Sequence, residues 1–114
     1  MPSVLITGTS TGIGLETARL FARHGYRVYA GARNPAASEG LQRAVAEGLP
    51  LTPIALDVDR DDSVREAVAQ VGPVDVLVNN AGIGSAAAVE QMPMEEIRAI
   101  FDSNVFGAVC MLQR

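Results

Sequence analysis

Apolar and polar positions along the chain follow two patterns, and each pattern predicts its own kind of element. Short continuous apolar runs, typical of strands buried on both faces, stand at 4–7, 27–31, 52–56 and 74–78. Apolar residues elsewhere recur every three or four positions and predict helices over about 13–24, 34–46, 61–71 and 93–113. The alternation of strands and helices predicts a parallel sheet with helices on both faces and right-handed crossovers.

A glycine-rich stretch joins the first predicted strand to the first predicted helix. Residues 7–14 are Thr-Gly-Thr-Ser-Thr-Gly-Ile-Gly. Glycine permits a tight turn and a close approach of the backbone to a pyrophosphate, and the helix N-terminus offers unpaired N–H groups. This position favours a dinucleotide site over a plain glycine-rich turn. The lack of a following Lys-Ser/Thr pair argues against a triphosphate-binding P-loop.

The spacing Gly-x-x-x-Gly-x-Gly, from Gly8 to Gly14, resembles that of the short-chain dehydrogenase/reductase family. Three further motifs match the family in order: 57–58 (Asp-Val), 79–82 (Asn-Asn-Ala-Gly) and 104–107 (Asn-Val-Phe-Gly). The resemblance covers the whole chain, and the strand sequences look most like the hydroxysteroid and retinol dehydrogenase branch. It implies an α/β, Rossmann-type doubly wound parallel sheet, here incomplete, with about four strands in the order 3-2-1-4.

The resemblance also implies a set of cofactor-binding residues. Asp57 would hydrogen-bond the adenine amino group while Val58 packs on the ring. A helix-capping aspartate remains the alternative, for which Asp59 and Asp61 look better suited. Asn80 would mainly brace the structure beside residues that line the cofactor. The full set is Gly8, Thr9, Ser10, Gly12, Ile13, Gly14, Arg33, Asp57, Val58, Asn80, Ala81 and Gly82.

The end of the second predicted strand bears on the choice between the two nicotinamide dinucleotides. An acid there would bind the adenosine ribose hydroxyls and favour NAD, but residues 31–33 are Gly-Ala-Arg. Arg33 is placed where a guanidinium can clamp a 2′-phosphate, and Ser10 can add a hydroxyl donor. An exposed arginine on a polar loop is the alternative. We therefore predict NADP(H) over NAD(H).

Asn104 stands out on the last predicted helix because it falls within an apolar stripe. The stripe consists of Ile97, Ile100, Phe101, Val105, Ala108 and Leu112. A buried amide must find partners or costs about 1–3 kcal/mol, and asparagine favours a locally disturbed helix. The resemblance implies that Asn104 is catalytic and helps hold a water in a proton relay. A satisfied core asparagine, or a misjudged helix register that exposes it, remains open.

Composition excludes several classes of chemistry. The chain has nine arginines, no lysine and a formal net charge of -4, which argues against a nucleic-acid partner held by bulk charge. One cysteine and one histidine argue against a zinc site. The absence of a signal peptide or a long apolar run predicts a cytoplasmic protein with no membrane partner. The family's Ser-Tyr-Lys set cannot be assigned, and neither Ser85 nor Ser103 matches the catalytic serine.

These observations predict an NADP(H)-dependent oxidoreductase that transfers a hydride between nicotinamide and a secondary alcohol or ketone. We expect residues 1–114 to be the N-terminal, cofactor-binding part of one Rossmann domain. That part would lack turnover alone and would associate through its exposed sheet edge. The full-length protein would be a homo-oligomer. A non-catalytic dinucleotide-binding module, such as a redox sensor or scaffold, is the alternative, and a methyltransferase is a weaker one.

Overall fold

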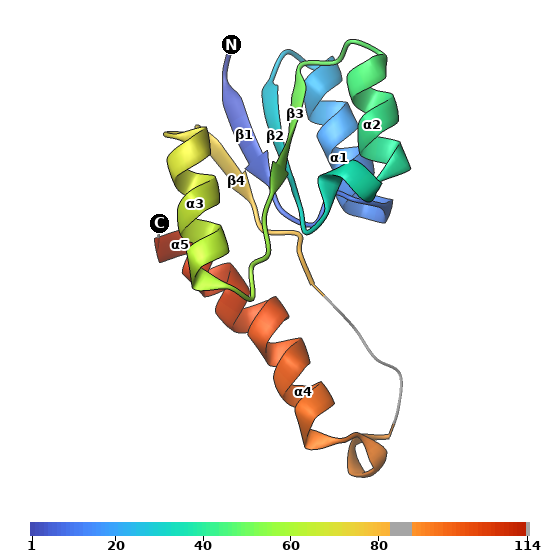
Figure 1. Ribbon diagram of the computed structural model, residues 1–114, viewed down its shortest axis with the longest axis vertical. Coiled ribbons are helices and arrows are strands. Elements are labelled where there is room, and N and C mark those ends of the chain that lie inside the picture. Colours follow the sequence, from blue (N-terminus) through green and yellow to red (C-terminus); the bar gives the residue numbers. More distant parts are fainter. Residues whose placement is uncertain (83–87, 114) are drawn as a thin grey trace.

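The structure is a computed structural model that describes residues 1–82 and 88–113 (Figure 1). Ser85 lies outside the described residues. The four strands are β1 (Ser3–Ile6), β2 (Arg27–Ala32), β3 (Leu51–Ala55) and β4 (Val76–Val78). They form one sheet in the order β3-β2-β1-β4, and every neighbouring pair is parallel. The predicted strand order is therefore confirmed.

The helical elements alternate with the strands as predicted. They are α1 (Gly12–Arg23), η1 (Pro35–Ala37), α2 (Glu39–Ala46), α3 (Asp61–Val71), η2 (Val89–Gln91), α4 (Met94–Phe101), η3 (Asp102–Gly107) and α5 (Ala108–Gln113). Among the described residues, no helix combines the length and the apolar character needed to cross a membrane.

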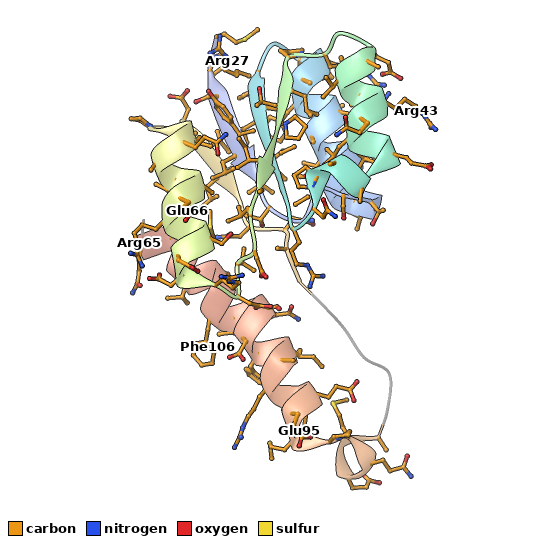
Figure 2. The ribbon with its side chains drawn as sticks, in the orientation of Figure 1. Arg27, Arg43, Arg65, Glu66, Glu95 and Phe106 are labelled. Atoms are coloured by element: carbon orange, nitrogen blue, oxygen red, sulfur yellow. The ribbon has the colours of Figure 1, made fainter. Side chains whose placement is uncertain are left out.

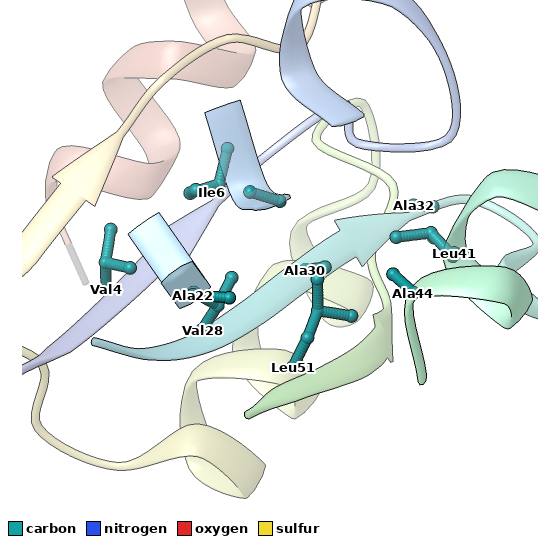
Figure 3. Packing of buried hydrophobic residues seen from close by; sticks show 10 residues of the cluster. Val4, Ile6, Ala22, Val28, Ala30, Ala32, Leu41, Ala44 and Leu51 are labelled. Atoms are coloured by element: carbon teal, nitrogen blue, oxygen red, sulfur yellow. The ribbon is translucent and has the colours of Figure 1, made fainter. Parts of the chain in front are cut away.

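Each face of the sheet carries its own apolar core. Successive side chains of a strand point to opposite faces, so Val4 and Ile6 lie with α1 and α2, whereas Leu5 lies with α3 and α5 (Figures 1 and 3). The buried residues of the first core are Val4, Ile6, Ala18, Ala22, Val28, Ala30, Ala32, Leu41, Ala44 and Leu51. Those of the second core are Leu5, Ile54, Leu56, Val64, Ala67 and Met111. This two-sided burial explains the continuous apolar strand sequences.

Three predicted elements begin later in the structure than the sequence indicates. β4 begins at Val76. Just before it, the Asp75 carboxylate accepts the Ser3 N–H at 2.8 Å and the Asp75 N–H donates to the Ser3 carbonyl at 3.1 Å. The second helix does not run unbroken from 34. Pro35 starts a separate 3-10 turn, and Ser38 then caps α2 by accepting the Leu41 N–H. The last helix begins one residue after Pro93, which is its N-cap.

The last helical segment contains the disturbance that an internal asparagine favours. Residues 102–107 form a π-helix between α4 and α5, with Asn104 inside it. The π-helix adds a residue to the turn and shifts the face that the helix presents. The predicted apolar stripe is therefore wrong in register. The buried residues are Ser103, Gly107 and Met111, while Phe101, Asn104, Val105 and Leu112 are exposed.

Candidate functional site

A cleft of about 380 Å³ lies at the carboxyl ends of the strands. It is bounded by the glycine loop, the end of β2, the loop from β3 to α3, the loop after β4 and the π-helix. Its lining residues are Gly8, Ser10, Thr11, Ile13, Gly14, Ala32, Arg33, Leu56, Asp57, Val58, Asp59, Asn80, Ala81, Gly82 and Ser103. The structure thus brings together every predicted cofactor-binding residue except Thr9 and Gly12.

The glycine loop carries the chain from β1 into α1 with its backbone packed tightly. Gly8 has a φ of 67°, which L side chains rarely adopt. A Cβ added to Gly14 would lie 2.1 Å from the carbonyl oxygen of Gly8, so the loop has no room for a side chain there. No side chain of the described residues caps the first turn of α1, and that turn holds no acid. Its N–H groups suit an anion such as a pyrophosphate.

Thr7 and Asn80 hold the glycine loop against the loop that follows β4. The Thr7 hydroxyl oxygen accepts the N–H groups of Asn80 and Ala81 at 2.9 and 2.8 Å. The amide nitrogen of Asn80 donates to the carbonyl of Gly8 at 3.0 Å. Asn80 therefore braces two walls of the cleft, as predicted for its structural role.

Thr9, which the sequence predicts to bind the cofactor, does not line the cleft. It is fully buried, and both its N–H and its hydroxyl donate to the carbonyl of Gly31 at 3.0 Å. Its side chain therefore ties the glycine loop to β2 and does not line the cleft. Gly12 lines an adjoining cavity instead.

That adjoining cavity, of about 630 Å³, extends from the glycine loop to α2. Ser10, Thr11 and Arg33 line both cavities. Arg33 is exposed at the end of β2, and its guanidinium has no ion pair within 1–82 and 88–113. The carbonyl of Ser10 accepts the Ser38 hydroxyl at 2.7 Å, which fixes the loop beside Arg33. Arg33, a cation, and Ser10, a hydroxyl-bearing residue, therefore both border the region where the two cavities meet.

The loop from β3 to α3 forms the opposite wall. The carboxylate of Asp57 accepts the Asp59 N–H at 3.0 Å, and the Asp57 N–H donates to the Ser63 hydroxyl oxygen at 2.9 Å. Neither aspartate caps α3, because Arg60 is its N-cap and Asp61 lies in its first turn. The capping role predicted for Asp59 is therefore wrong: its carboxylate accepts a hydrogen bond from Ser103.

Asn104 lies beside the loop after β4. A Cβ added to Gly82 would lie 2.9 Å from the Asn104 side-chain oxygen, so the amide sits against that backbone. Asn104 is exposed, which agrees with the alternative of a shifted register. The π-helix thus holds Asn104 at the end of the cleft formed by Ala81 and Gly82.

Sequence reasoning missed four hydroxyl or carboxyl groups that shape the cleft: Thr7, Ser38, Asp59 and Ser103. Thr7 and Ser38 lie at an element boundary, where side chains commonly bond to backbone or to another loop. Each joins residues at least 28 positions apart. The sequence contains no periodic signal for such pairs.

Comparisons with known proteins agree with this arrangement. The sequence model of the short chain dehydrogenase family matches residues 2–114. The chain is 41% identical to human retinol dehydrogenase 8 and 36% identical to an uncharacterized oxidoreductase of Myxococcus xanthus. These matches cover 97% and 96% of the chain but 38% and 46% of the two proteins. The chain thus spans about half or less of the length of these relatives. The first match agrees with the predicted resemblance to retinol dehydrogenases.

Solved structures give the same result. A gluconate 5-dehydrogenase from Burkholderia cenocepacia, solved in complex with NADP and tartrate, has a TM-score of 0.86 and 33% identity. A short-chain type dehydrogenase/reductase from Mycobacterium marinum has a TM-score of 0.85 and 37% identity. The alignments cover 98% of this chain and 46% and 47% of theirs. With a family match over 2–114, this sheet order and this glycine loop, the chain belongs to the short-chain dehydrogenase family.

Proposed function

We propose that the cleft binds NADP(H) in preference to NAD(H), in an oxidoreductase that acts on a secondary alcohol or ketone. The observation that carries the preference is Arg33, an exposed guanidinium between the two cavities with no ion pair among the described residues. A guanidinium can bind a 2′-phosphate through two parallel N–H bonds, and no acid stands at 31–33 to repel it. The NADP complex of the similar gluconate 5-dehydrogenase supports this proposal.

Each section of the cleft suits one part of the dinucleotide. The uncapped first turn of α1, with Gly12 and Gly14, would hold the pyrophosphate. Asp57 would accept a hydrogen bond from the adenine amino group while Val58 packs on the ring. The backbone at Ala81 and Gly82 would lie against the nicotinamide ribose. NADPH would supply a hydride when bound, and the residues of this chain would orient it.

Asn104 is the residue that we propose for the proton side of the reaction. It lies against Gly82, at the end of the cleft where the nicotinamide would bind. An amide carries both donors and an acceptor, so it can hold a water in a defined orientation. That water would belong to the proton relay that the family resemblance implies.

We further propose that residues 1–114 are the cofactor-binding part of a larger catalytic unit. The chain contains no lysine, so a Tyr-Lys pair cannot be formed from it. The whole protein would be a cytoplasmic homo-oligomer. We expect residues 1–114 to bind NADPH without oxidising it when a panel of ketones and aldehydes is added. Sustained loss of NADPH absorbance above a no-protein blank would contradict this proposal.

Calorimetric titration of residues 1–114 with NADPH and with NADH tests the preference. We expect NADPH to bind about tenfold more tightly or better, since charge-assisted bonds to the extra phosphate contribute about 1.5–3 kcal/mol. The difference should shrink at high salt because Arg33 is exposed. Equal affinities, or tighter NADH binding, would overturn the proposed preference.

A further inference from the structure

A hydrogen bond between two side chains joins the π-helix to the far wall of the cleft. The Ser103 hydroxyl lies 2.8 and 2.9 Å from the two carboxylate oxygens of Asp59. Ser103 is only 5% exposed, although its neighbours Asp102 and Asn104 are exposed. Hydrogen bonds to an ionised carboxylate are shorter and stronger than neutral ones. The pair therefore fixes the position of the β3–α3 loop.

A second contact lies one turn further along the helix. A Cβ added to Gly107 would lie 2.8 Å from a methyl group of Val58, so the Val58 side chain rests directly on the helix backbone. Ser103 and Gly107 are both buried. The loop is thus held at two consecutive residues, Val58 and Asp59, by two positions on one face of the helix.

The hydrogen bonds within the loop carry this restraint to Asp57. The Asp57 carboxylate accepts the Asp59 N–H at 3.0 Å. The Asp57 carbonyl also accepts the Arg60 N–H at 3.1 Å. A displacement of Asp59 would therefore move the carboxylate of Asp57 and the side chain of Val58 together.

The π-helix directs neighbouring residues to two walls of the cleft. Ser103 bonds to the β3–α3 loop, whereas Asn104 lies against Gly82 in the loop after β4. The spacing between these walls is set on one side by the pair Ser103 and Asp59. This pair lies within the cleft lining and forms no part of the glycine loop.

We propose that Ser103 and Asp59 are positioning residues for the adenosine end of the cofactor. Their hydrogen bond holds Val58 and Asp57 at the separation from the glycine loop that an adenine ring needs. The inference rests on the proposed function of the cleft as an NADP(H) site. Loss of the bond should weaken every ligand that contains the adenosine 2′-phosphate part, whether or not it carries nicotinamide.

The test is a set of calorimetric titrations with NADPH and with adenosine 2′,5′-bisphosphate, which lacks the nicotinamide half. Ser103→Ala and Asp59→Ala remove the hydrogen bond, whereas Asp59→Asn keeps a side-chain oxygen that can accept it. Ser3→Ala is the matched control. Its hydroxyl also donates to an aspartate, Asp75, but at the other end of β1, away from the cleft.

We expect Ser103→Ala and Asp59→Ala to weaken both ligands by the same factor, about tenfold. Asp59→Asn and Ser3→Ala should bind nearly as the unmodified chain does. If Ser103→Ala binds adenosine 2′,5′-bisphosphate as the unmodified chain does, the inference is overturned but the proposed function is not. Equal losses in Asp59→Asn and Asp59→Ala would also overturn it, because charge rather than the hydrogen bond would be responsible.

Two further outcomes are informative. If the unmodified chain binds neither ligand, the proposed function fails and the inference fails with it. If Ser103→Ala does not fold, the exposed Asp59 provides the decisive pair, since Asp59→Asn and Asp59→Ala differ in whether they keep the acceptor. In that case, a loss of binding in Asp59→Ala that is absent in Asp59→Asn would support the inference, and equal losses would overturn it.

Discussion

The hydroxyl oxygen of Thr7 accepts the backbone N–H of Ala81 at 2.8 Å, across 74 positions of sequence. Thr7 directly follows β1, and Ala81 lies in the loop that follows β4. The same oxygen accepts the Asn80 N–H, while the hydroxyl points to the Val78 carbonyl. One buried side chain thus fixes the loop against which the cofactor would lie.

Replacing Thr7 by valine keeps the shape and removes the acceptor. The Ala81 N–H would lose its hydrogen-bond partner, and the Asn80 N–H would keep only the Val78 carbonyl at 3.1 Å. A buried donor without a partner costs about 1–3 kcal/mol. We expect Thr7→Val to lower the free energy of unfolding by that amount or more and to weaken NADPH binding. Urea unfolding and calorimetry measure the two effects.

Thr7→Ser and Thr52→Val are the controls for this variant. Serine keeps the hydroxyl, and Thr52 is an exposed β3 residue whose side chain makes no hydrogen bond among the described residues. Both variants should remain close to the unmodified chain in stability. A Thr7→Val protein as stable as Thr52→Val would show that the loop is held by other means.

Gly14 has no room for a methyl group, and this predicts a second variant. A Cβ there would meet the Gly8 carbonyl oxygen at 2.1 Å and the Asn80 amide nitrogen at 2.5 Å. Both neighbours are fixed by the bracing of the glycine loop, so the backbone must move. We expect Gly14→Ala to abolish measurable NADPH binding and to destabilise the chain by about 1–3 kcal/mol.

Gly40→Ala provides a matched comparison in another helix. The three atoms nearest to the added methyl all belong to the Leu15 side chain, whose far end can rotate away. Alanine also favours a helix over glycine by about 1 kcal/mol. Gly40→Ala should therefore keep NADPH binding. Loss of binding in both variants would refute the role assigned to the glycine loop.

Arg33 is the residue on which the cofactor preference depends. Arg33→Ala should weaken NADPH by about tenfold or more and leave NADH nearly unchanged, because only NADPH carries the phosphate that the guanidinium would bind. Arg27→Ala is the control, since Arg27 starts the same strand at its opposite end (Figure 2). Parallel losses for both dinucleotides would refute a phosphate-specific role.

The sequence predicted those features that depend on local pattern and strand order. The glycine loop, Asp57 and Asn80 reach one cleft because parallel strands end at the same edge of the sheet. Thr9 was misassigned because a position in a ligand-binding motif does not reveal which way a side chain points. The hydrogen bond between Ser103 and Asp59 spans 44 positions and depends on tertiary packing alone.

The last helix shows the limit of periodicity. A regular period of 3.6 residues groups Phe101 with Asn104 and Leu112, but the π-helix changes the register between them. Ser103 is buried in place of its neighbours. An asparagine inside a helix indicates that a disturbance is favoured there, but not which residues it turns inward.

The exposed apolar side chains on this helix predict that residues 1–114 self-associate. Phe101 is 52% exposed, Phe106 62% and Leu112 70%, and Phe106 projects outward from the helix (Figure 2). β4 is an edge strand of the sheet, so two sources of association are present. We expect the sedimenting mass to rise with protein concentration.

A variant that lacks both aromatic rings tests whether the helix or the strand edge causes the self-association. Phe101→Ser with Phe106→Ser should shift the sedimentation profile toward the monomer, because burial of apolar area contributes about 25 cal/mol per Å² to association. Glu95→Ser, an exposed polar change on the same helix, is the control and should leave the profile unchanged. If the unmodified chain is a monomer at every concentration, the exposed face does not drive association. If the double variant associates as strongly as the unmodified chain, the unpaired edge of β4 is the contact instead.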